Sequence, residues 1–356
     1  MQHEVLTTGG ARAEFDQTVT YLNTATYGLP PRRSWAELDL ALAAYRAGRV
    51  NPPSYDRSVQ RARSAFARLV DVDVAQVAVG SQVSSFVGLV AASLPPGSEV
   101  LTATGDFTSL LFPFHVQQSR GVTVREAPLE EIAESVTERT TLVAVSLVQS
   151  ADGRLLDLPR LREASERTGS RILLDITQAA GWLPVAAGTV DYTVCGGYKW
   201  LLTPRGTAYL TVRPDLMDAL VPLLAGWYAG EDPWQAIYGA PLRLAGNARR
   251  FDLSPVWHSW VAAAPALEML AEMDITTVQA HSVGLANQFR AGLGLEPGDS
   301  AIVSLVVDEQ APEALLAADI AAASRAGRLR LSFHLANDEA DVAHAVTAIG
   351  PHVITD

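Results

Sequence analysis

Lysine is almost absent from this chain of 356 residues. Of its 27 basic residues, 26 are arginines, and Lys199 is the single lysine. An arginine can replace a lysine in an ion pair or on a solvated surface, but a guanidinium cannot act as a neutral amine nucleophile near neutral pH. The retention of a lysine at this position therefore favours a chemical role. The alternative is that one lysine remained by chance.

Cysteine and long apolar runs are also scarce. Cys195 is the one cysteine, so an intramolecular disulfide is excluded, which agrees with a reducing compartment. No apolar run is long enough to cross a bilayer. The first 20 residues contain four charged side chains and no long apolar segment, which argues against a signal peptide or a membrane anchor. These observations predict a cytoplasmic protein.

The chain also lacks a net positive charge, histidines at the spacing of metal ligands, and a serine hydrolase motif. The net charge of −12 argues against nucleic acid or an anionic membrane as a partner. The seven histidines are scattered without the spacing of zinc ligands, and no GxSxG elbow is present. The composition, 48% hydrophobic and 19% charged, is that of an ordinary globular protein with a large core.

What the sequence does contain is a carboxylate placed 24 residues before the lysine. Arg171 to Asp175 is a short apolar run that ends in an acid, which predicts a buried parallel strand with Asp175 at its carboxyl end. Ligands bind at that edge of open α/β sheets. An amine that forms a Schiff base and an acid that pairs with a pyridinium nitrogen are what pyridoxal phosphate requires. The alternative for Asp175 is the capping of a helix that begins near Thr177.

The pattern of strands and helices predicts an α/β fold. Strands spaced by helices indicate a mostly parallel sheet of seven strands covered by helices on both faces. The expected strands are Val74–Val79, Val100–Ala103, Val122–Arg125, Leu142–Leu147, Ile172–Asp175, Tyr192–Cys195 and Thr207–Val212. After about Leu216 the pattern becomes more helical, with helices over Trp257–Met273, Thr277–Leu293, Pro312–Ala323 and Glu339–Ile349 and strands over Ala301–Val306 and Arg328–His334.

The same pattern predicts two domains. We expect residues 61–245 to form a large domain, residues 246–356 to form a smaller α+β domain, and residues 1–60 to pack with the smaller one. No repeat, low-complexity tract or long linker is present.

Three further sites near strand ends are candidates for the same chemistry. Ser81 and Gln82 follow a strand and precede a helix, where free backbone N–H groups bind phosphate, although most such turns bind nothing. Phe107 follows the next strand and has a face that can stack on a flat ring, whereas core packing is the alternative. Gln178, about one helical turn after Asp175, can donate to a ring hydroxyl, with plain surface exposure as the alternative.

Three segments together resemble the class V aminotransferase and cysteine desulfurase-like branch of fold-type I pyridoxal phosphate enzymes, from about Tyr21 to the end of the chain. They are LLDITQA at 173–179, GGYKW at 196–200 with TPRG at 203–206, and RRFDLSP at 249–255. The resemblance implies that Lys199 holds the cofactor, that Asp175 pairs with the ring nitrogen and that Gln178 contacts the ring hydroxyl.

The resemblance implies roles for further residues. Phe107 takes the ring-stacking position, Ser81 and Gln82 take the phosphate loop, and Tyr198 stands where many relatives have a phosphate-contacting histidine. Ser254 matches a residue that reaches the phosphate of a neighbouring subunit, which implies a homodimer with active sites at the interface. Ala25 and Tyr27, in the segment where the resemblance begins, are candidate substrate contacts.

Arg330 matches the arginine that binds the substrate α-carboxylate. Arg328 and Arg330 alternate with leucines, so both guanidinium groups lie on one face of a strand, where a fork-shaped cation suits a carboxylate. A solvated strand face is the alternative. The preference for Arg330 over Arg328 rests on the resemblance alone.

The chain also departs from the family pattern. Cysteine desulfurases place a catalytic cysteine in the later part of the chain, but residues 321–327 contain none, so persulfide chemistry lacks its nucleophile. Gly196 replaces a serine that contacts phosphate in many relatives. We therefore expect an amino-acid-directed pyridoxal phosphate enzyme, in the first place an aminotransferase. β-Elimination, as in C–S and sulfoxide lyases, and epimerisation with Tyr198 or Tyr27 as the opposing acid stay open, as does a silent homologue that only binds a ligand or partner.

Overall fold

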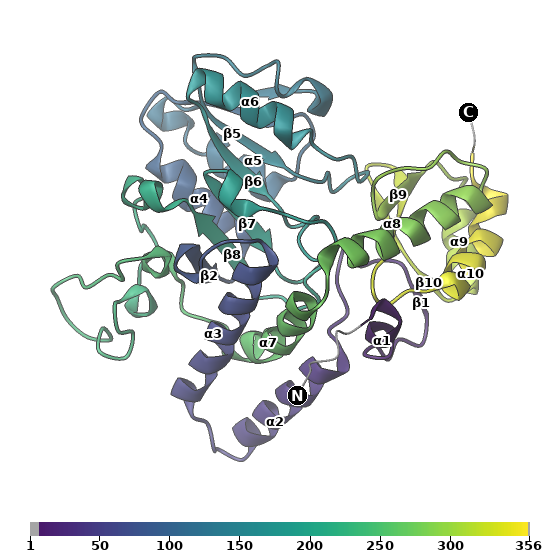
Figure 1. The fold of residues 1–356 in the computed structure, drawn as a ribbon, viewed down its shortest axis with the longest axis horizontal. Helices are drawn as coiled ribbons and strands as arrows, with labels where there is room; N and C mark the ends of the chain where they lie inside the picture. The colour runs from purple at the N-terminus through teal and green to yellow at the C-terminus, as the bar shows by residue number, and fades with distance from the viewer. Residues whose placement is uncertain (1–6, 355–356) are drawn as a thin grey trace.

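The computed structural model describes residues 7–354, and a seven-stranded sheet forms its centre (Figure 1). The strand order is β2-β8-β7-β6-β5-β3-β4. All neighbouring pairs are parallel except the two that β8 makes, with β2 and β7. The fold class expected from the sequence is confirmed. The strands are β2 (Val77–Gly80), β3 (Glu99–Ala103), β4 (Thr123–Ala127), β5 (Thr140–Ser146), β6 (Arg171–Asp175), β7 (Tyr192–Gly196) and β8 (Ala208–Val212).

Both faces of this sheet are buried, because successive side chains of a strand point to opposite faces and both sets are apolar. In β5, for example, Val143 and Val145 belong to one hydrophobic cluster, while Leu142 and Ala144 belong to another. The first cluster also includes side chains from α3 (Pro52–Leu69), α6 (Leu158–Thr168) and α7 (Trp257–Glu272). The second includes side chains from α4 (Val83–Ser93) and α5 (Thr108–His115).

A second, smaller group of elements lies beside the large sheet and is coloured green to yellow in Figure 1. It contains a three-stranded antiparallel sheet in the order β11-β12-β9. The elements are α8 (Ile275–Gly292), β9 (Ile302–Leu305), α9 (Ala311–Ala317), β10 (Ile320–Ala321), β11 (Ala323–Arg325), β12 (Arg328–Ser332) and α10 (Glu339–Ile349). A separate hydrophobic cluster holds them together.

The N-terminal part of the chain contacts this smaller group. After α1 (Thr8–Arg12), strand β1 (Thr20–Tyr21) pairs in parallel with β10, and Leu22 belongs to the smaller group's hydrophobic cluster. Helix α2 (Arg32–Arg46) then packs against α7. The boundaries at residues 60 and 245 stay a prediction, and residues 1–6 of the predicted N-terminal segment lie outside the described residues. No helix within residues 7–354 is long and apolar enough to span a membrane.

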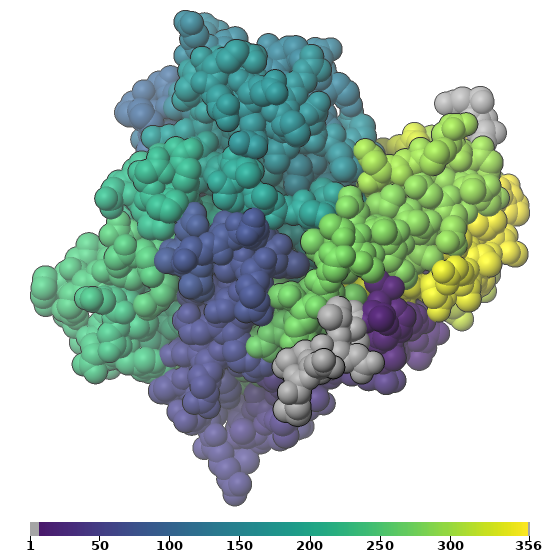
Figure 2. All heavy atoms as spheres, in the orientation of Figure 1, coloured from purple at the N-terminus to yellow at the C-terminus, as the bar shows by residue number. Residues whose placement is uncertain are grey.

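Two expectations about local structure were wrong. No helix follows Asp175, because residues 177–183 form turns, so Asp175 caps none and Gln178 is not one helical turn away. The helix expected over Pro312–Ala323 ends at Ala317, and the chain turns through Asp319, at φ 50°, into β10. Between β8 and α7 the chain forms three short 3-10 helices and an isolated bridge from Gly230 to Leu244, and part of this stretch projects from the body, as Figure 2 shows in green.

Candidate active site

A cavity of about 330 Å³ opens at the carboxyl edge of the large sheet. Parallel strands bring the residues that follow them to one edge, which is where ligands bind in such folds. The cavity is lined by seven residues singled out from the sequence, namely Ser81, Gln82, Phe107, Asp175, Gln178, Tyr198 and Lys199. It is also lined by Val83, Ser84, Ser109, Ser146, Ser150, Thr177, Gly196, Arg205, Gly206 and Thr207.

The lysine lies on the turn that connects β7 to β8. Leu202 donates its N–H to the Lys199 carbonyl at 3.0 Å, which closes this turn. The N-terminal segment packs directly against it, because the Gly28 N–H donates to the Tyr198 carbonyl at 2.8 Å. A Cβ atom on Gly28 would lie 1.9 Å from the Lys199 carbonyl oxygen, so only glycine permits this approach.

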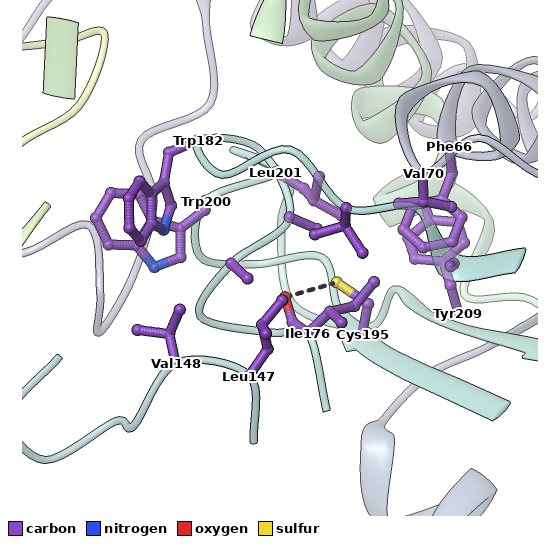
Figure 3. Packing of buried hydrophobic residues seen from close by; sticks show 14 of the residues in the cluster. Phe66, Val70, Leu147, Val148, Ile176, Trp182, Cys195, Trp200, Leu201 and Tyr209 are labelled. Atoms are coloured by element: carbon purple, nitrogen blue, oxygen red, sulfur yellow. Dashed lines mark hydrogen bonds between the residues drawn. The ribbon is translucent and has the colours of Figure 1, made fainter. Parts of the chain in front are cut away.

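Apolar side chains of one hydrophobic cluster pack around the turn and the ends of β6 and β7. Trp182 and Trp200 pack with their ring centroids 5.6 Å apart, and Cys195 faces the Ile176 carbonyl (Figure 3). Burial raises the pKa of the Cys195 thiol well above its usual value, so the thiol is neutral and unreactive. The role of this cysteine is therefore packing.

The Lys199 amine is buried, with 6% of the residue exposed. Burial lowers its pKa to about 8, with the charge of Arg330 acting in the same direction and that of Asp175 opposing it. Desolvation disfavours an ammonium ion, so a substantial fraction of this amine is neutral near pH 8. A neutral buried amine is the form that attacks a carbonyl group.

The Asp175 carboxyl group is buried in the same cavity, with 5% of the residue exposed. Burial raises its pKa to about 6, although the Thr177 N–H, which donates to Oδ1 at 2.8 Å, acts against this shift. The charge of Asp106 raises the pKa further, and that of Lys199 lowers it. Above pH 6 the cavity therefore contains a buried negative charge, which a bound cation would stabilise.

The orientation of the Gln178 amide is fixed by its partners. Trp200 Nε1 can only donate, and it donates to Gln178 Oε1 at 2.7 Å. The amide nitrogen therefore points the other way, donating to Ala25 O and to Ser150 Oγ at 3.0 Å each. Donation to a ring hydroxyl requires Gln178 to give up one of these contacts, and the Ser150 hydroxyl lines the same cavity.

The start of α4 forms one wall of the cavity. The side chain of the N-cap residue Gln82 accepts no N–H of the first turn and instead donates to the Ser85 hydroxyl at 3.2 Å, and Ser81, Val83 and Ser84 also line the cavity. The first N–H groups of a helix lack partners within the helix, and the helix dipole favours an anion there. This wall suits a phosphate group.

Two aromatic rings flank the lysine. The Phe107 ring centroid lies 5.2 Å from Lys199 Nζ, and that of Tyr198 lies 5.8 Å from it. The Arg205 guanidinium covers the Tyr198 ring at 4.5 Å. Phe107 is 43% exposed and lines the cavity, so it is not a core residue and a ligand can reach it.

Four predicted site residues do not line this cavity. Arg330 is buried behind it and donates to the backbone and side-chain oxygens of Ser150. The Ala25 carbonyl accepts from the Gln178 amide, which does line the cavity. Tyr27 is 40% exposed, and its ring centroid lies 6.0 Å from that of Tyr198. Ser254 is exposed, and its contact with the phosphate of a neighbouring subunit stays a prediction.

Sequence reasoning missed several polar residues of the site. Asp106 is buried, accepts from the Ser146 N–H and hydroxyl at 2.8 and 2.5 Å, and fixes the Phe107 N–H at 2.6 Å. Its position directly before Phe107 could have drawn attention to it. Arg205 lay within a quoted motif but had no role, and the Thr26 hydroxyl contacts Arg330. The aromatic residues within 227–258 do not line this cavity.

Comparison with known proteins identifies the family. The model of the family "Aminotransferase class-V" matches residues 54–314, which is more than half of the chain. This chain belongs to the class V aminotransferase family. It is therefore a pyridoxal phosphate-dependent enzyme of fold type I, as the sequence predicted.

Individual relatives cover most of the chain. The Bacillus subtilis protein named uncharacterized aminotransferase YcbU is 30% identical over 82% of this chain and 83% of its own length. Isopenicillin N epimerase of Streptomyces clavuligerus is 26% identical over 81% and 78%. The crystal structure of the cysteine desulfurase CsdA from Escherichia coli matches with a TM-score of 0.82 at 22% identity, over 97% of this chain and 98% of that one. The last likeness shows the fold.

The residues of the cavity fit the cofactor of this family. Pyridoxal phosphate has an aldehyde, a ring nitrogen that can carry a proton, and a phosphate group. The cavity offers an amine for the first, a buried carboxylate for the second and the N-terminus of α4 for the third. The donor set is thus complementary to each functional group of the cofactor.

Proposed function

We propose that this enzyme is an aminotransferase in which Lys199 Nζ carries pyridoxal phosphate as a Schiff base. The observation that supports the proposal most is the presence of a buried amine and a buried carboxylate in one cavity, opposite a helix N-terminus. When bound, the cofactor supplies an electron-poor ring that stabilises negative charge at the substrate α-carbon.

Lys199 has two tasks in this proposal. Its lowered pKa makes the neutral amine available as a nucleophile near neutral pH. With the cofactor bound, the free amine of Lys199 would take the proton from the substrate α-carbon and later return a proton as a general acid. The buried position of Nζ keeps bulk water away from this transfer.

The other residues of the site bind and orient the cofactor and the substrate in this proposal. The Asp175 carboxylate holds the positive charge of the ring, and the N–H groups at the start of α4 bind the phosphate. Phe107 would contact the ring, and Gln178 would donate to the ring hydroxyl in place of one of its contacts with Ala25 and Ser150. Arg330 binds the α-carboxylate of the substrate, and a guanidinium fork is well suited to that group.

The reaction type is tested by separating the products. The enzyme is incubated with each of a panel of amino acids, with and without 2-oxoglutarate, while the keto acid, pyruvate, ammonia and the chirality of the remaining amino acid are assayed. Keto acid formed only with the amino acceptor is the expected result. Pyruvate and ammonia formed without an acceptor would replace the proposal with β-elimination, and inversion of chirality would replace it with epimerisation.

The proposal includes a homodimer, with Ser254 reaching the phosphate group bound by the other subunit. Its support is the exposure of Ser254 together with the partly exposed Phe107 in the cavity wall. We expect a dimer in light scattering and a weaker cofactor affinity in Ser254→Ala. A monomer that binds the cofactor with full affinity would contradict this.

We also propose a cytoplasmic location, supported by the one buried thiol, and subcellular fractionation tests it.

A further inference from the structure

Two arginines converge on one hydroxyl group behind the cavity. Arg330 Nη2 donates to Thr26 Oγ1 at 2.6 Å, and Arg325 Nη2 donates to the same oxygen at 3.2 Å. The two guanidinium groups therefore lie next to each other. Arg330 also contacts Ser150, which lines the cavity, so the inner cation of the pair is adjacent to that space and Arg325 lies on the outer side of it, across Thr26.

The strand register explains the convergence. In the antiparallel pair of β11 and β12, Ala323 lies opposite Arg330 and Arg325 lies opposite Arg328. Residues two apart on a strand point to the same face, so the three arginines share one face of the sheet. Arg330 is 1% exposed, whereas Arg325 is exposed at the end of the hairpin. The two cations thus lie at different depths.

The charge of this pair is not compensated by the protein. Within residues 7–354, neither Arg325 nor Arg330 has a carboxylate oxygen within 4.0 Å, although the chain contains 39 acidic residues. Burial is the largest cause that lowers the pKa of Arg330 and of Lys199, and the positive charge of Arg325 acts in the same direction on both. Adjacent like charges are unfavourable, so an arrangement of this kind is stable when an anion binds between or beside them.

A single α-carboxylate needs only one of these cations, because one guanidinium binds a carboxylate with two hydrogen bonds. We propose that Arg325 binds a second anionic group, carried by the side chain of the substrate, and that this enzyme acts on amino acids with acidic side chains. The inference rests on the proposed function, in which Arg330 binds the α-carboxylate. The outer position of Arg325 matches a group further from the α-carbon.

Binding of unreactive ligands tests this assignment without turnover. Isothermal titration calorimetry of the cofactor-loaded enzyme compares glutarate with glutaramate, and succinate with succinamate. Each pair differs only in replacement of one carboxylate by a neutral amide, and none of the four has an amino group. 3-Phosphonopropionate is added to distinguish a carboxylate from a phosphate-like second anion. The variants are Arg325→Gln, Arg330→Gln and, as a matched control, Arg328→Gln.

Arg328 is a suitable control because it lies on the same face of the same hairpin and is exposed like Arg325. Its side chain donates instead to the hydroxyl and carbonyl oxygens of Ser304, at 3.2 and 3.4 Å. Removal of either charge lowers the formal charge of the hairpin by one. A change seen with Arg325→Gln and not with Arg328→Gln therefore reports direct contact with the ligand.

The expected result is that the unaltered enzyme binds each dicarboxylate about tenfold or more tightly than its amide, as a charge-assisted hydrogen bond provides. Arg325→Gln removes this preference and leaves the affinity for the amides unchanged, while Arg330→Gln weakens all ligands and Arg328→Gln keeps the preference. Equal affinity for acids and amides, including no measurable binding of either, would overturn the inference. So would an equal loss for both in Arg325→Gln.

A failure of the proposed function has a different signature. If pyridoxal phosphate forms no adduct at Lys199, the proposed function falls and the inference falls with it. If the adduct forms and the dicarboxylate preference is absent, the inference alone fails.

Discussion

Lys199 and Asp175 line one cavity, and burial shifts the pKa of each group in the direction that favours its neutral form. The pKa of the lysine falls to about 8, and that of the aspartate rises to about 6. Both shifts have desolvation as their largest cause, since a dry environment disfavours a charge of either sign. In the cofactor-free protein, both groups are therefore largely charged only between about pH 6 and about pH 8.

The rate at which the cofactor-free protein captures pyridoxal phosphate should depend on the pKa of Lys199. The neutral fraction of an amine rises as the pH increases through its pKa, so capture accelerates up to about pH 8 and then levels off. Stopped-flow absorbance between pH 6 and 10 measures the rate.

The control for this experiment is an exposed lysine model compound, whose amine has an ordinary pKa of about 10.4. Its reaction with pyridoxal phosphate continues to accelerate above pH 9. A protein profile that follows the model compound would show that the amine is not desolvated.

Asp175→Asn should separate activity from stability. Loss of the negative charge beside the ring lowers the rate of amino acid turnover, by about 100-fold or more if the effect is like that of other catalytic electrostatic contacts. The folded-state pKa lies above the unfolded value of 3.8, so ionisation destabilises the cofactor-free fold as the pH rises from about 4 through about 6. The amide removes this penalty, which is about 3 kcal/mol at most.

Thermal unfolding of the cofactor-free proteins at pH 7.5 checks the second part. The variant should have the higher Tm at that pH, with the difference shrinking toward pH 4. A variant that is both inactive and less stable at pH 7.5 would indicate a structural role for the carboxylate.

Gly28→Ala should disturb the lysine turn. The new Cβ would lie 1.9 Å from the Lys199 carbonyl oxygen, so backbone must move. We expect a loss of about 1–3 kcal/mol in stability and a weaker affinity for pyridoxal phosphate. Gly284→Ala, in α8 with open space around the new Cβ, is the matched control and should gain about 0.5–1 kcal/mol. Similar behaviour of the two variants in denaturant unfolding would refute the close approach.

The buried ion pair between Arg63 and Asp252 should stabilise the fold near the carboxyl end of β2. Arg63 Nη2 lies 2.6 Å from Asp252 Oδ2, and Asp252 Oδ1 accepts the Val79 N–H of β2 at 2.8 Å. Arg63→Ala leaves a buried charge without a partner and should cost about 3–5 kcal/mol.

Arg61 provides the comparison for that pair. Arg61 lies on α3 like Arg63 and pairs with Glu37 of α2 and Glu268 of α7, but its side chain is 39% exposed. Arg61→Ala should therefore cost only about 1 kcal/mol or less in urea unfolding. Equal costs for the two variants would show that burial of the Arg63 pair is not what makes it important.

The large sheet could be predicted because its strands are short apolar runs with helices between them. The same reasoning placed Asp175 and Lys199 at one edge, since the carboxyl ends of parallel strands meet there. The turn at residues 177–183 could not be predicted in this way. Gly181 adopts φ 110° and a Cβ there would lie 2.3 Å from the Trp200 carbonyl oxygen, a constraint set by a segment about 20 residues away.

The substrate side of the site was less accessible to sequence reasoning. Thr26 and Arg330 are 304 positions apart, and no local pattern indicates that their side chains meet. The strand β10, which shortened an expected helix, exists because it pairs with β1 near the other end of the chain. Such contacts depend on tertiary packing, which overrides local preference.

The most direct test of the account is the identity of the residue that holds the cofactor. The enzyme is loaded with pyridoxal phosphate, reduced with borohydride and analysed by intact mass and peptide mapping, with Lys199→Arg as the control that keeps the positive charge. Because Lys199 is the only lysine, we predict one adduct per chain, located in the peptide that contains it, and none in the variant. An adduct at the N-terminal amine, or no adduct in the unaltered enzyme, would contradict the account.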